Sequence, residues 1–207
     1  MKRALLVLAL VVAAAALWPR SPATAPAPPG MVLVPAGECL LGQDRHKAYV
    51  KAFYIDLREI TNVEVRAVKP DFVYPPGRES YPAVGLLRPE AEAVLAALGK
   101  RLPTGPEWEK AARGTDGRTY PWGEEPPEGR ANVGKIQPHT CNSLKMLPVG
   151  SFPRGASPYG CLDMIGNAFE WCSDEEHGHF ILRGGAIGYP DRYNRTYAEA
   201  IEDTGVT

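Results

Sequence analysis

One stretch of about 45 residues, from 115 to 159, constrains the fold of this 207-residue chain more than any other feature. It is rich in Gly, Pro and Asn and shows no helical or strand periodicity, apart from a short candidate strand at residues 148–152. A loop of that length without structure of its own is uncommon inside a compact domain. Other parts of the chain must therefore hold it in place. The 21 Gly and 21 Pro of the whole chain likewise predict short elements joined by many turns.

The composition limits the classes of protein to consider. A hydrophobic content of 44% and a charged content of 23% fit one folded domain and exclude a disordered tail or a multi-spanning membrane protein. The first 25 residues hold three basic residues and no acid, so the rest of the chain has 20 basic and 24 acidic residues and a net charge of −4. This balance argues against a nucleic-acid partner.

The N-terminus has the pattern of a secretory signal peptide. Lys2 and Arg3 precede an uncharged, apolar run at residues 4–18, and small residues follow at 22–25. The run is 15 residues long, short of the ~20 that cross a bilayer, which makes an uncleaved anchor the less favoured alternative. We predict a signal peptide at 1–25, a Pro-rich spacer at 26–30 and a folded domain at 31–207. The expected location is periplasmic or extracellular, with membrane contact only through an uncleaved N-terminal segment.

Export changes what the four cysteines predict. An oxidising compartment favours disulfides among Cys39, Cys141, Cys161 and Cys172. Proximity in the sequence favours the pair Cys141–Cys161. The chain has no C-x-x-C pair, and its His residues do not interleave with Cys at the spacing of a zinc site, which argues against structural zinc.

Three helices are predicted from local signals. Thr61 and Glu64 form a capping box for a helix that Lys69-Pro70 ends. A second helix runs from Pro89 to Gly99, with apolar residues at helical spacing. A third starts with the Thr104–Glu107 capping box and ends at residue 114.

The predicted strands are short. A hairpin is expected to join residues 31–35 to residues 39–42 across a Gly turn, and a strand follows at residues 50–56. Further strands are expected at residues 168–173 and 180–183, with a third candidate at 193–198.

Six segments in order resemble the formylglycine-generating enzyme family, the sulfatase-modifying factor domain with a variant of the C-type lectin fold. They are MVLVPAGECLLG (31–42), FYIDLREITNVEV (53–65), GKRLPTGPEWEKAARG (99–114), YPWG (120–123), PVGSFPRGASPYGCLDMIGNAFEWCSD (148–174) and LRGGA (182–186). The resemblance implies a single α+β domain with two to three helices, short antiparallel strands, much ordered coil and a loop region held by calcium.

The resemblance also implies where structural calcium binds. The matching positions are the side chains of Asp163 and Glu170 and the carbonyls of Gly166 and Ala168. A hard cation takes such oxygen ligands from an irregular loop. A second site would use Asn132, the Val133 carbonyl and a side chain near residues 141–143, where the usual acid is missing. The alternative is that the two acids are turn residues paired with Arg154 or Arg183.

Two departures from the family argue against catalysis. Members that make formylglycine bind copper through a cysteine pair shortly after the segment matching Arg183-Gly184-Gly185, and here no Cys follows Cys172. Because monovalent copper prefers soft thiolate ligands, copper is not expected. The chain also reaches Thr207 without the Gly-Phe-Arg motif of the family's last strand. Iron-dependent relatives hold their metal on a separate helical domain, for which 207 residues leave no room.

Two regions are candidate ligand-binding surfaces. Trp122 lies in a Pro-Trp-Gly turn, and the stretch after residue 188 is rich in aromatic, amide and guanidinium groups, which are typical of binding surfaces. The predicted contact residues in this stretch are Tyr189, Arg192, Tyr193 and Asn194. A polar strand and loop without a ligand is the alternative. The pair His177 and His179 is interpreted as part of a solvated polar loop.

The residues together favour an exported, non-catalytic member of the family, a calcium-stabilised module that binds or scaffolds a protein or cell-envelope ligand. The alternative is a metal-dependent oxidase of the formylglycine-generating or nonheme-iron type, acting on protein or thiol substrates.

Overall fold

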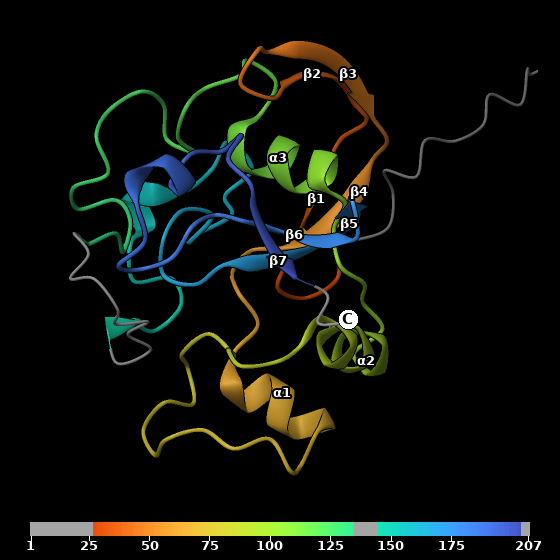
Figure 1. Cartoon of the computed structure of the whole chain (residues 1–207), viewed down its shortest axis with the longest axis vertical. Coiled ribbons are helices and arrows are strands. Elements are labelled where there is room, and N and C mark those ends of the chain that lie inside the picture. Colours follow the sequence, from red (N-terminus) through yellow and green to blue (C-terminus); the bar gives the residue numbers. More distant parts are fainter. Residues whose placement is uncertain (1–26, 135–144, 204–207) are drawn as a thin grey trace, which may run out of the picture.

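The computed structural model describes residues 27–134 and 145–203, and within them the three predicted helices are present (Figure 1). They are α1 (Asn62–Val68), α2 (Arg88–Ala97) and α3 (Gly105–Arg113). The helix starts follow local chemistry. At α3, the Glu107 carboxylate accepts from the Thr104 N–H at 2.9 Å while the Thr104 hydroxyl accepts from the Glu107 N–H at 3.2 Å. Such a capping box provides acceptors for backbone N–H groups that the first turn of the helix leaves unpaired.

The strands form small antiparallel sheets, as expected for the α+β fold predicted from the sequence. The pairs are β1 (Met31–Val34) with β4 (Phe53–Asp56), β2 (Gly37–Leu41) with β3 (His46–Val50), and the three-stranded order β5 (Glu170–Glu176), β6 (His179–Arg183), β7 (Ala200–Asp203). The β2–β3 hairpin and α3 lie at one end of the molecule, and α1 and α2 lie at the other (Figure 1).

The predicted hairpin between residues 31–35 and 39–42 is wrong, because β1 pairs with β4 and β2 pairs with β3. The chain changes sheets at Pro35, which has no N–H to continue a ladder. The carbonyls of Pro35 and Gly37 are instead capped by the buried ammonium of Lys110, at 2.7 and 3.0 Å.

The strands predicted at residues 148–152 and 193–198 are also absent, and β7 begins at Ala200. Thr196 shows the reason for the second error. Its N–H donates to the Thr119 carbonyl at 3.0 Å, and its hydroxyl donates to the Arg118 carbonyl at 2.8 Å. The Thr196 N–H is therefore bonded to a loop far away in the sequence and cannot join a strand ladder.

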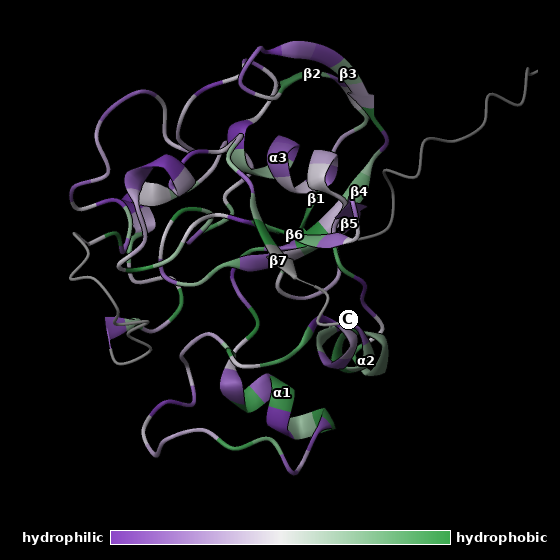
Figure 2. Cartoon of the chain, viewed as in Figure 1, coloured by the Kyte–Doolittle hydropathy of each residue, from purple (hydrophilic) through white to green (hydrophobic). Residues whose placement is uncertain are grey.

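The apolar side chains gather in two cores. The larger one packs α3 against the strands and includes the fully buried Trp108. Hydrophobic residues alternate with hydrophilic ones along α1, as expected for a helix with one buried face (Figure 2). The smaller core lies between α1, α2 and their connecting loops, around Val65, Phe72 and Val94. The two cores leave a groove between them, described below.

Two buried side chains hold the long loop. Arg113 donates to the carbonyls of Gly117 and Arg118, at 2.6 and 3.2 Å. Asn167 accepts from the Leu147 N–H at 2.9 Å and donates to the Leu147 carbonyl at 3.2 Å. Protein hydrogen bonds thus fix parts of the stretch for which the sequence predicts calcium.

Three of the four cysteines, Cys39, Cys161 and Cys172, are buried free thiols, so no disulfide joins any two of them in the structure. Cys141 lies outside the described residues, and a bond to it stays a prediction. No helix in the described part of the chain is both long and apolar enough to span a bilayer. The predicted signal peptide also lies outside the described residues.

Candidate functional site: a groove above buried carboxyls

A groove of about 1330 Å³ separates the α1–α2 end of the molecule from the sheet β5–β6–β7. One wall comes from α2 and residues 82–87, and the other from β6, β7 and residues 186–193. Leu87 and Ile201, on opposite walls, are 66% and 62% exposed. An apolar lining with exposed apolar residues from both walls is the usual character of a binding site.

Glu59 lies at the base of this groove, next to Asn167. Its carboxylate accepts from the Asn167 side-chain amide at 2.8 Å and from the Ala168 N–H at 3.1 Å. Asn167 adopts φ 57°, a left-handed conformation that Asn tolerates, and so turns its amide inward. Burial raises the pKa of Glu59 well above its usual range, and the charges of Glu170 and Asp163 raise it further.

Glu170 and Asp163 are the two other carboxyls of this region. The Trp108 indole N–H donates to Glu170 at 2.7 Å, and the Gly150 N–H donates to Asp163 at 2.5 Å. Burial raises the pKa of Glu170 to about 7, with a further contribution from Asp163, although the Trp108 hydrogen bond opposes the shift. Burial also raises the pKa of Asp163. Each carboxyl thus has one oxygen bound by a protein donor.

Asn132, from the second predicted calcium site, and Gly166, from the first, lie side by side. Asn132 forms a parallel bridge with Gly166, and the Asn132 amide donates to Asn167 at 2.9 Å. Val133 follows on the same segment, while the third part of the second predicted site, residues 141–143, lies outside the described residues. No group of three or more His, Cys, Asp or Glu that could hold a metal occurs among residues 27–134 and 145–203. Calcium here would need backbone carbonyls as well as carboxylates.

The electrostatics of the three carboxyls fit a hard cation. Glu59, Asp163 and Glu170 appear in none of the ion pairs between described residues. Arg183, one of the two partners named in the alternative interpretation, pairs with Glu109 and Glu199 instead. Buried like charges without a cation raise one another's pKa. An oxygen-only donor set suits calcium better than copper.

An aromatic cluster lines the groove beside these acids. The ring of Phe169 packs edge-on against Tyr189 at 4.7 Å and against Tyr193 at 6.1 Å. Arg192 lies over the Tyr193 ring at 4.6 Å. Edge-to-face pairs of this kind are rigid contact surfaces. Three predicted ligand-binding residues, Tyr189, Arg192 and Tyr193, therefore lie together here.

The two other predicted ligand-binding residues lie elsewhere. Asn194 is 1% exposed and packs against Gly185, so it lies beneath the surface rather than on it. Its burial also places the Asn194-Arg195-Thr196 sequon out of reach of glycosylation in the folded domain. Trp122 lines a different pocket.

The sequence did not single out Glu59 or Phe169. Glu59 is 108 residues from Asn167, and it stands just before the Thr61 cap, where an acid resembles an ordinary helix-start residue. Phe169 lies between Asp163 and Glu170 in the predicted calcium segment. Its aromatic partners, Tyr189 and Tyr193, are 20 or more residues away, so the sequence did not show that they would meet.

The architecture defines the class of protein to which the chain belongs, the short-stranded α+β domains with a C-type-lectin-like fold. Treponema denticola variable protein 1 superposes with a TM-score of 0.69 at 19% identity, covering 85% of this chain and 90% of that protein. PvdO from Pseudomonas aeruginosa superposes with a TM-score of 0.64 at 23% identity, covering 84% and 88%. Likeness at such identity shows the fold alone.

A family model described as "Sulfatase-modifying factor enzyme 1-like domain" matches residues 17–204, and the chain belongs to this family. The formylglycine-generating enzyme of Mycobacterium tuberculosis is 40% identical over 110 residues, which are 49% of this chain and 36% of that enzyme. The formylglycine-generating enzyme of Streptomyces coelicolor is 36% identical over 152 residues, which are 60% of this chain and 48% of that enzyme. Hercynine oxygenase of M. tuberculosis is 47% identical over 88 residues, which are 40% of this chain and 19% of that enzyme. The matches span less than half of each relative's length.

Proposed function

We propose that this chain is an exported, non-catalytic member of the family that binds a protein or cell-envelope ligand in its groove and is stabilised by calcium. The observation that carries the proposal is the groove itself, whose exposed apolar edges and aromatic wall offer contact area. The stretch that would carry the copper thiolates instead contains Tyr189, Arg192, Tyr193 and the buried Asn194. Phenol and guanidinium groups offer contact area and hydrogen bonds but are poor ligands for monovalent copper.

Calcium would be held by the free oxygens of Asp163 and Glu170 together with the carbonyls of Gly166 and Ala168. It would neutralise the acids at the base of the groove and tie the 163–170 turn to strand β5. The chain's own contribution is to keep these oxygens oriented, through the Trp108 and Gly150 donors.

The first prediction is thermal stabilisation by calcium. A ligand that binds only the folded state stabilises it by RT ln(1 + [L]/Kd), so calcium at about 100 Kd should add roughly 2.7 kcal/mol. Glu170→Ala should lose most of this response, whereas Glu92→Ala, on the exposed side of α2, should keep it. Melting curves with calcium and with chelator measure both. Equal melting temperatures for the wild type in the two buffers would rule out the site.

The second prediction is that the chain does not convert cysteine to formylglycine. Copper-loaded protein is incubated with a peptide bearing the Cys-x-Pro-x-Arg target, and mass spectrometry follows the cysteine. We expect no change above a heat-denatured control. Turnover that chelation abolishes would refute the non-catalytic role.

The alternative function is a metal-dependent oxidase, which the similarity to a formylglycine-generating enzyme and a hercynine oxygenase favours. The same incubation with iron and a thiol substrate tests the second enzyme class. Oxidation of either substrate would support the alternative.

A further inference from the structure

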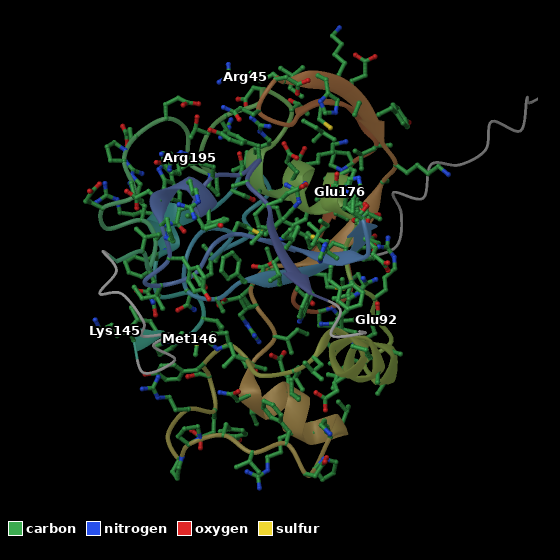
Figure 3. All side chains as sticks on the ribbon, viewed as in Figure 1. Arg45, Glu92, Lys145, Met146, Glu176 and Arg195 are labelled. Atoms are coloured by element: carbon green, nitrogen blue, oxygen red, sulfur yellow. The ribbon has the colours of Figure 1, made fainter. Side chains whose placement is uncertain are left out.

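A second pocket, of about 330 Å³, opens beside the turn of the β2–β3 hairpin. It is at the end of the molecule where Figure 3 labels Arg45, away from Glu92 on α2. Six residues line it: Arg45, Asp116, Arg118, Trp122, Gly123 and Glu124. None of them lines the groove, so the two sites are distinct.

The pocket contains an ordered aromatic platform. The rings of Trp122 and Tyr120 are stacked, with centroids 5.1 Å apart and planes 3° apart. The Arg195 guanidinium covers the Tyr120 ring at 4.9 Å. The Trp122 indole N–H donates to the Glu125 carbonyl at 2.9 Å. These contacts fix the position of the indole. One face of the ring packs against Tyr120, and the indole also lines the pocket.

The charged groups around the platform form two pairs of opposite charge. Arg118 donates twice to Asp116, at 3.0 and 2.7 Å. Arg45 lies 4.0 Å from Glu124, which accepts from the Thr119 N–H at 2.8 Å. Two guanidinium and two carboxylate groups leave the pocket with no net charge. It therefore presents donors and acceptors without attracting either an anion or a cation overall.

The backbone of Arg45 is an unusual feature of this pocket. Its φ is 56°, in the left-handed region that residues other than Gly rarely adopt. Its side chain lies beside Gly117, where a Cβ would stand 3.4 Å from both Cγ and Cδ of Arg45, an ordinary van der Waals distance. The chain thus holds an arginine over the pocket where Gly would be less strained.

We propose that this pocket is a subsite for a neutral saccharide. A pyranose ring has an apolar C–H face, which suits the indole, and hydroxyl groups that both donate and accept, which suit the guanidinium and carboxylate pairs. Because the two guanidinium and two carboxylate groups cancel, the pocket offers no net attraction to a phosphate or to a cation. The proposal concerns a site outside the groove and does not depend on the function proposed for the groove.

The test uses the whole chain on an array of neutral and acidic glycans, followed by saturation-transfer NMR with the neutral oligosaccharide that binds best. We expect transfer to ring C–H protons, and a loss of affinity of about tenfold or more in Trp122→Ala. Arg45→Gly should lose affinity to a similar extent while keeping or raising the melting temperature, because Gly accepts the left-handed φ without strain. The matched control is Arg66→Ala, which removes an exposed arginine of α1 whose guanidinium lies over the Tyr74 ring. This variant should bind as the wild type does.

Because Trp122→Ala could disturb the loop, Arg45→Gly decides the outcome. A stable Arg45→Gly protein with wild-type affinity overturns the proposal. So does an array on which no neutral glycan binds, or on which only acidic glycans bind.

Discussion

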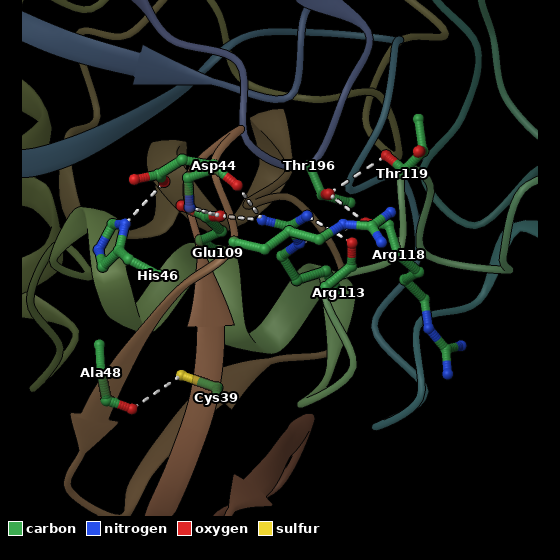
Figure 4. Close-up of polar contacts among 12 residues, drawn as sticks. Cys39, Asp44, His46, Ala48, Glu109, Arg113, Arg118, Thr119 and Thr196 are labelled. Carbon is green, nitrogen blue, oxygen red and sulfur yellow. Dashed lines mark hydrogen bonds and ion pairs between the residues drawn. The ribbon is translucent and has the colours of Figure 1, made fainter.

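Glu109→Ala is expected to lower the free energy of unfolding by about 3–5 kcal/mol, because it leaves two buried guanidinium groups without their shared carboxylate. Glu109 is 3% exposed. One oxygen accepts from Arg113 at 2.5 Å (Figure 4) and from the Gly42 N–H at 2.7 Å, and the other accepts from Arg183 at 3.3 Å. The substitution therefore disconnects α3 from both β6 and the turn after β2.

Chemical denaturation at neutral pH measures this loss. Glu92→Ala is the matched control, since its i,i+4 pair with Arg88 is half-exposed and is worth only about 0.3–0.5 kcal/mol. Glu109→Gln keeps the shape and an acceptor and should fall between the two. If Glu109→Ala unfolds within about 1 kcal/mol of the wild type, the buried ion pairs contribute far less than their burial indicates.

The residues at and around helix α3 show which parts of the fold could be predicted from the sequence. The helices were predictable because their signals are local: Thr104 and Glu107 are three residues apart and satisfy each other. Strand pairing was not, because β1 pairs with β4 rather than with the next strand, and the carbonyl between β1 and β2 is capped by Lys110, 75 residues later. No local pattern encodes such a contact.

The functional regions divide in the same way. The predicted calcium turn is one short segment of the sequence, whereas the pairing of Asn132 with Gly166 appears only in the folded chain. Glu59 could not be found, because only the folded chain shows that it faces Asn167. Similarly, the sequence marked Trp122, but Arg45 comes from a turn more than 70 residues earlier, and nothing in its neighbourhood predicts a left-handed backbone.

Glu170 also gives the metal-free protein an unusual dependence on pH. Its pKa is about 7 in the folded state, against an ordinary value of 4.5. Between these values the folded state binds more protons than the unfolded state, so stability falls as the pH rises. At 1.36 kcal/mol for each pKa unit, the loss from about pH 4.5 to 7 is about 3 kcal/mol. The raised pKa values of Glu59 and Asp163 act in the same direction.

Carboxyls with lowered pKa values act outside this window. Burial would raise the pKa of Glu64, but hydrogen bonds from Arg58 and Thr61 outweigh it and lower the pKa to about 2. Its contribution is complete above about pH 4.5 and is lost as the pH falls toward 2. The decline on the neutral side can therefore be assigned to the acids around the groove.

We expect the free energy of unfolding in chelator to fall between pH 5 and pH 7, and Glu170→Gln to remove about 2 kcal/mol of that decline. Gln is close in shape and can still accept from Trp108, so it imitates the protonated acid at every pH. Calcium should flatten or reverse the wild-type curve, because coordination requires the carboxylate and thus lowers its pKa. Urea titrations at pH 5, 6 and 7, with calcium and with chelator, measure all three curves. Parallel curves for wild type and Glu170→Gln in chelator would show that Glu170 is ionised throughout. A calcium response of equal size at pH 5 and pH 7 would show that the metal does not bind this carboxylate.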